Sequence, residues 1–113
     1  MNSLLRIFVS STDKVKNDLL CESIVLAAKN KGIAGATVFK GILGYGASSV
    51  IQSSKFWEVT DKVPIVIEIM DDEVAVRDFY ESIRQQLESM RYGCLVTIEK
   101  IEVLMFKTGK KRE

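Results

Sequence analysis

Three glycines and two serines lie within residues 39–49, FKGILGYGASS. Glycine lets a backbone approach a ligand closely and adopt positive φ without a clash at Cβ. Because this segment follows ATVF, a run typical of a β-strand, a loop that cradles phosphate is the first hypothesis. The G-x-x-G-x-G spacing matches neither the G-x-G-x-x-G dinucleotide fingerprint nor the Walker type, which needs Gly-Lys-Ser or Gly-Lys-Thr. A hairpin connection that binds no ligand is therefore the competing interpretation.

The composition excludes several kinds of chemistry. The chain has 113 residues, two cysteines and no histidine, which excludes a Ser-His-Asp triad, a histidine general base and histidine metal ligands. Two cysteines alone cannot complete a zinc site within the chain, so we expect no metal. The formal net charge of +1 argues against nucleic acid as a partner, because phosphate backbones select strongly basic faces.

The length fits one domain, residues 1–113, of which residues 107–113, KTGKKRE, form a basic tail. The sequence contains no apolar run of eighteen residues, and its start lacks a basic segment followed by a sustained apolar one. We therefore expect neither membrane insertion nor a signal peptide. These features favour a cytoplasmic protein in which Cys21 and Cys94 stay free.

Hydrophobic periodicity predicts six elements in the order β-α-β-β-α-β. The strands are expected at residues 4–10, 34–41, 62–71 and 94–106, and the helices at 14–31, capped by SSTD, and from the acidic cluster 71–73 to Gly93. This order is that of the ferredoxin-like fold, an α+β architecture with two helices on one face of an antiparallel sheet. In the last strand the apolar parity shifts across Glu99 and Lys100, which suggests a bulge or two short strands.

The sheet face opposite the helices is expected to be apolar. Its predicted members are Leu4, Phe8, Val66, Met70, Leu104 and Phe106. In a monomer many of these side chains would be exposed, and an exposed apolar sheet face usually marks an assembly interface. The pattern therefore predicts a homo-oligomer.

Three segments, ATVFKGILGYGASS, VPIVIEIMDDE and GCLVTIEKIEVLMFKTG, resemble the PII-like signalling proteins. They resemble more closely the PII-related group known as domain-of-unknown-function family 190, and the resemblance covers nearly the whole chain. It implies a ferredoxin-like homotrimer that binds an adenine nucleotide (ATP, ADP or AMP) in clefts between subunits. It further implies signalling without catalysis, in which the loop after the second strand regulates a membrane transporter or an enzyme.

The resemblance also implies a set of nucleotide-binding residues. Gly44 and Gly46 would lie against the nucleotide, and Ser48 near phosphate. Tyr45 would stack on the base, although an aromatic residue between glycines serves equally as a packing anchor. In the second loop, RYG, Gly93 occupies the last glycine position.

Cations are implied at fewer positions than in PII proteins. Lys107 matches a basic residue that reaches the phosphates of a neighbouring subunit. Ala47, Cys94 and Met105 stand where PII proteins carry basic side chains, and Arg91 with the tail cations Lys110, Lys111 and Arg112 would compensate for them.

Other proteins share this fold, and four alternatives remain open. A trimeric metal-tolerance protein of the CutA type, or another ferredoxin-like module for a small ligand, fits the element order. An RNA-recognition module also fits, but its RNP1 signature lies on the third strand, whereas KGILGYG follows the second. An acylphosphatase needs a phosphate loop and an arginine after the first strand, and VSSTDK supplies neither.

Overall fold

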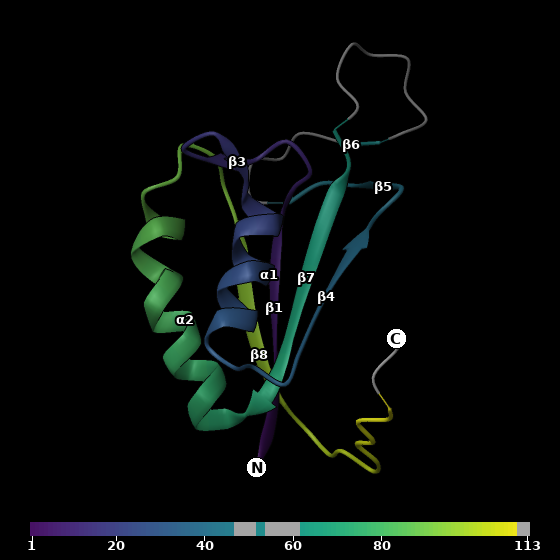
Figure 1. Ribbon diagram of the computed structural model, residues 1–113. Helices are drawn as coiled ribbons and strands as arrows, with labels where there is room; N and C mark the ends of the chain where they lie inside the picture. The colour runs from purple at the N-terminus through teal and green to yellow at the C-terminus, as the bar shows by residue number, and fades with distance from the viewer. Residues whose placement is uncertain (47–51, 54–61, 111–113) are drawn as a thin grey trace.

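The computed structural model describes residues 1–46, 52–53 and 62–110 (Figure 1). The two helices are α1 (Leu20–Asn30) and α2 (Glu73–Glu88). The strands are β1 (Asn2–Ser10), β2 (Lys14–Val15), β3 (Asp18–Leu19), β4 (Gly35–Lys40), β5 (Leu43–Gly44), β6 (Gln52–Ser53), β7 (Pro64–Asp72) and β8 (Leu95–Ile101).

Four of these strands form the main sheet, in the order β4-β7-β1-β8, with every neighbouring pair antiparallel. Both helices cover the same face of this sheet (Figure 1). The predicted α+β, ferredoxin-like architecture is thereby confirmed. Two ribbons of two strands each, β2-β3 and β5-β6, are additions that hydrophobic periodicity did not predict.

The core lies between the sheet and the helices. Leu5, Ile7 and Val9 alternate along β1 with less buried residues, as the period of a strand requires. Helix α2 contributes a stripe with helical spacing, and Phe79 at its centre is 1% exposed. Pro64 begins β7, where its missing N–H costs the sheet nothing.

The acidic cluster at the start of α2 acts as a cap, as predicted. The Asp72 carboxylate accepts a hydrogen bond from the backbone N–H of Val74 at 3.2 Å and lies 3.1 Å from the amino-terminal ammonium group. The ammonium group, and then Val74, lower the pKa of Asp72. Asp71 instead accepts a hydrogen bond from the N–H of Ala34 at 2.9 Å, which ties the end of β7 to the residue before β4. Among the described residues, no helix is long and apolar enough to cross a membrane.

The first helix was predicted too long. Residues 14–19 form the β2-β3 ribbon, and α1 begins only at Leu20. The reason is local, because Lys16 adopts φ 56°, a left-handed conformation that no helix can include. Leu19 precedes the helix without a side-chain cap, so the predicted capping by SSTD was wrong. The predicted C-terminal glycine is correct, since Gly32 has φ 77°.

Two later boundaries also differ from the prediction. Helix α2 ends at Glu88 and is followed by Ser89 at its C-cap, which leaves Gly93 in the loop before β8. Strand β8 ends at Ile101 and keeps an unbroken register with β1, so it contains no bulge. Leu104 and Phe106 therefore lie outside the sheet, and Leu104 is 90% exposed.

Candidate ligand-binding site

A cavity of about 610 Å³ lies at one end of the main sheet. Residues within 8–13, 41–46, 62–66 and 92–95 line it. These segments meet because β1 ends where β7 and β8 begin, as the antiparallel pairing of β1 with both neighbours requires. Residues 41–46 after β4, which contain three glycines and are called the glycine turn below, close a further side of the cavity. The cavity thus joins the glycine turn to the second predicted loop, although the two lie far apart in the sequence.

The glycines of the turn have different structural roles. A Cβ at Gly41 would come within 2.7 Å of the ring of Pro64. The backbone N–H of Gly41 donates a 2.7 Å hydrogen bond to the carbonyl of the same proline. Gly41 is therefore required by packing. A Cβ at Gly46 would meet nothing within 4 Å, and Gly46 has no positive φ. Gly46 is therefore not required by a left-handed conformation or by contact with the described protein atoms, and it lines the cavity.

An aromatic side chain from the second loop lies beside two cations. Nζ of Lys62 is 5.7 Å from the centre of the Tyr92 ring, and Cζ of Arg91 is 6.0 Å from the same centre. Both distances are in the range of a cation–π contact. Lys62 and Tyr92 line the cavity, whereas Arg91 does not.

Asp13 is a cavity residue that the sequence analysis missed. It is 4% exposed, and its Oδ2 accepts a 2.9 Å hydrogen bond from the backbone N–H of Ser10. The backbone N–H of Asp13 donates in turn to the Ser10 carbonyl at 3.1 Å. These two bonds hold the carboxylate against the end of β1. In a structure, a buried aspartate is uncommon and therefore indicates a candidate functional residue. In the sequence, Asp13 is the last residue of SSTD, a segment typical of a helix N-cap.

Cys94 lines the same cavity as Asp13. Burial raises the pKa of the Cys94 thiol, and the negative charge of Asp13 raises it further. The thiol therefore stays protonated at neutral pH, and Cys94 brings no charge to the cavity.

The Cys94 thiol should react slowly with alkylating reagents at neutral pH. In a Cys21→Ser variant, Cys94 is the remaining cysteine. Its alkylation by iodoacetamide should reach half its maximal rate at a higher pH than alkylation of a small model thiol, because only the thiolate reacts. In the double variant with Asp13→Asn, the midpoint should lie at a lower pH, because the negative charge that disfavours the thiolate is gone. The measurement is the alkylation rate between about pH 7 and 10. A midpoint at or below that of the model thiol would contradict the burial of Cys94.

The structure brings some of the predicted site residues together. Gly44, Tyr45, Gly46 and Gly93 line the cavity, and Arg91 lies beside it against Tyr92. Ser48 falls outside the described residues. Lys107 follows the far end of β8, and in Figure 1 the yellow tail leaves the sheet at the end opposite the β5-β6 ribbon. Within one chain Lys107 is therefore remote from the cavity.

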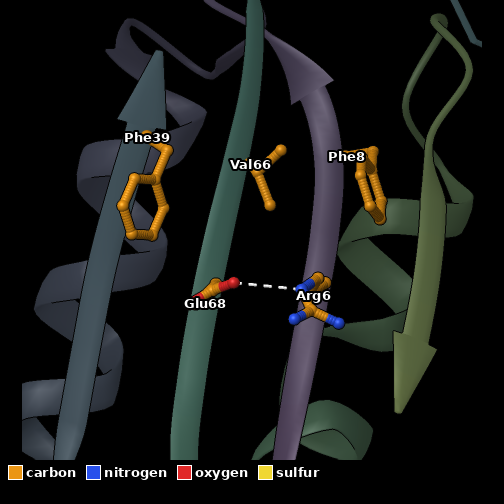
Figure 2. Close-up of a pocket in the computed structure, with 5 residues that line it drawn as sticks. All are labelled: Arg6, Phe8, Phe39, Val66 and Glu68. Atoms are coloured by element: carbon orange, nitrogen blue, oxygen red, sulfur yellow. Dashed lines mark hydrogen bonds and ion pairs between the residues drawn. The ribbon is translucent and has the colours of Figure 1, made fainter. Parts of the chain in front are cut away.

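The open face of the sheet carries a second, shallower hollow of about 300 Å³ (Figure 2). Phe8, Val66 and Phe39 point from this face, away from the helices, and Phe39 is 51% exposed. Next to them, Nε of Arg6 lies 3.0 Å from Oε2 of Glu68, and the same guanidinium pairs with Glu99. Hydrogen bonds to Glu68 and then to Glu99 raise the pKa of Arg6.

The fold has counterparts among solved structures. A nitrogen regulatory PII-like protein from Thiomonas intermedia K12, CPII, bound to ADP, AMP and bicarbonate, superposes with a TM-score of 0.64 at 17% identity, over 94% of this chain and 96% of the other. A putative PII-like signaling protein from Thermus thermophilus gives a TM-score of 0.60 at 15% identity, over 87% and 84% of the two chains. These likenesses define the fold as PII-like.

The family follows from sequence. The model of DUF190, described as "Uncharacterized ACR", matches residues 2–103, and the chain belongs to this family. A UPF0166 protein of Aquifex aeolicus is 34% identical over 101 residues, which cover 89% of this chain and 91% of the relative. The resemblance inferred from the three sequence segments is thereby confirmed.

Proposed function

We propose that this protein is a PII-like regulatory protein that binds an adenine nucleotide in the cavity between β1, β7, β8 and the glycine turn. The observation that carries the proposal is the meeting of Gly44, Tyr45 and Gly46 with Gly93 around one cavity. A cavity of about 610 Å³ lies within the range typical of small-molecule sites. Its lining combines aromatic rings, exposed backbone and a cation, which suit a base, a ribose and a phosphate respectively. The ADP and AMP bound to CPII support the same ligand class.

The proposed assembly is a homotrimer. Phe8, Val66 and Phe39 leave an apolar patch on the open face of the sheet, and such patches are usually covered by another chain. In a trimer, the tail of one subunit would reach the cavity of the next and bring Lys107 to its phosphates.

The proposed activity is signalling by a cytoplasmic protein without catalysis. The connection between β4 and β7 borders the cavity at both ends, through Gly41–Gly46 and Lys62. Occupation of the cavity would therefore act on this connection, which would engage a regulated transporter or enzyme. Tyr45 is 73% exposed, so it is available to stack on a base.

Isothermal titration calorimetry with adenosine, AMP, ADP, ATP and cyclic AMP tests the proposal directly. We expect saturable binding of at least one adenine nucleotide, with one site per chain. Inorganic phosphate and guanosine monophosphate are the controls, and both should bind about tenfold more weakly or worse. The absence of binding by every adenine compound at millimolar concentration would refute the proposed function.

Lys107→Ala tests the contribution of a neighbouring subunit to phosphate binding. We expect ADP to bind more weakly by roughly 1 to 3 kcal/mol, the size of a charge-assisted hydrogen bond, while adenosine binding changes little. The measurement is calorimetry of both ligands at low and high salt, because a partly exposed charge contact should weaken as salt increases. Equal losses for adenosine and ADP would assign Lys107 to the assembly instead, and no loss for either would remove it from the site.

A further inference from the structure

We propose that Asp13 determines how many phosphates the cavity accepts, so that the protein binds AMP more tightly than ATP. This inference rests on the proposed function, since it names the specificity of the same site. Asp13 is placed by geometry rather than by likeness to other proteins.

The Asp13 carboxylate is fixed in position. The side chain is 4% exposed, and one of its oxygens is held by the N–H of Ser10 at 2.9 Å. The Asp13 carbonyl accepts a 2.8 Å hydrogen bond from the N–H of Leu20, which anchors the same residue to the start of α1. The residue lines the cavity, and its charge acts on Cys94, which lines the cavity too. A negative charge therefore stands in the cavity wall at a fixed place.

The charges of the described lining residues cancel. Among them, only Asp13 and Lys62 carry a formal charge, because the remaining ones are apolar, aromatic, glycine, serine or a protonated cysteine. Lys62 is oriented toward the Tyr92 ring, on the segment that enters β7. Within one chain, one cation opposed by one buried carboxylate leaves no net positive charge for a second or third phosphate, which would depend on cations from a neighbouring subunit.

Each further phosphate adds a negative charge that Asp13 repels. The repulsion is strong because a buried carboxylate acts through a medium of low dielectric constant. The same carboxylate accepts hydrogen bonds well, so it suits the hydroxyl or amine groups of the nucleoside rather than its phosphates. Asp13 thus discriminates between ligands by phosphate number while tolerating the adenosine part.

The test is calorimetry of adenosine, AMP and ATP on the full chain and on Asp13→Asn. Asparagine keeps the size of the side chain and an oxygen for the Ser10 N–H. We expect the unmodified protein to bind AMP about fivefold more tightly than ATP, or better. In Asp13→Asn the ratio of AMP to ATP affinity should fall about tenfold, while adenosine binding stays within about threefold.

Two further variants complete the design. Asp18→Asn removes the same charge from the neighbouring β3 strand at an exposed position outside the cavity lining, and it should leave the ratio unchanged. Asp13→Ser also removes the carboxylate but keeps a hydroxyl oxygen that can accept from the Ser10 N–H, so it keeps the test valid even where Asp13→Asn fails to fold. It should lower the ratio as Asp13→Asn does.

The outcomes separate the two proposals. The role of Asp13 would be overturned if neither cavity variant changed the ratio of AMP to ATP affinity, or if the unmodified protein preferred ATP to AMP. Either result would leave the proposed function intact, because a nucleotide would still bind. Failure of the unmodified protein to bind any adenine compound would overturn both.

Discussion

Arg6→Ala is expected to dissociate the proposed trimer. Arg6 pairs with Glu68 and Glu99 on the open face of the sheet, beside the apolar patch that assembly would cover. Its removal would leave two carboxylates without their cation in a surface that must be desolvated, and an unpaired charge at a buried interface is strongly unfavourable. We expect the concentration at which half the protein is trimeric to rise roughly tenfold or more.

Light scattering coupled to gel filtration measures this change. The unmodified protein should have about three times the 12.7 kDa mass of the chain, and Arg6→Ala should approach the mass of one chain at micromolar concentration. Arg77→Ala is the matched control, because Arg77 pairs with Glu73 on the solvent-exposed side of α2 and should leave the mass unchanged. A variant of Arg6 that remains trimeric at low concentration would place the interface elsewhere.

Gly46→Val is expected to weaken nucleotide binding by about 100-fold with little change in stability. A Cβ at this position meets no protein atom within 4 Å, so the chain itself tolerates a side chain there. Gly46 lines the cavity, and we expect a branched side chain at this position to compete with the ligand for space. Thermal unfolding without ligand and calorimetry with ADP separate the two effects.

Gly41→Ala is the counterpart and should behave in the opposite way. Its methyl group would collide with the Pro64 ring at 2.7 Å, so we expect a loss of about 1 to 3 kcal/mol in the free energy of unfolding. Equal binding by Gly46→Val and the unmodified protein would reduce the glycine turn to a hairpin connection.

The elements with strong periodicity could be predicted from the sequence. Strand β7 alternates buried and less buried residues from Ile65 onward, and α2 repeats apolar residues at intervals of three and four. Both patterns arise because one side of the element is buried against the core. A short stretch of sequence is therefore enough to recognise them. The β2-β3 ribbon could not be predicted in this way, because it depends on the left-handed conformation of Lys16, a residue type that ordinarily avoids it.

The site was partly predictable for the same reason. Gly44, Gly46 and Gly93 stand out because glycine is a conspicuous residue in a loop. Asp13 does not stand out, because its burial arises from contacts with segments far along the chain. The proposed contact of Lys107 would be made across two subunits, and the periodicity of one chain carries no information about such a contact.

The walls of the cavity differ in stiffness. The wall built from β1 is a central strand with a continuous register on both sides, and those built from β7 and β8 are anchored to it. The wall built from the glycine turn is held by the bond from Gly41 to Pro64 and by the two-residue β5-β6 ribbon. In an elastic body, displacement concentrates in the most compliant part. A bound ligand is therefore expected to leave amide hydrogen exchange in β1 unchanged and to alter it at Leu43–Gly44. The displacement of the turn would then pivot where Gly41 is bonded to Pro64.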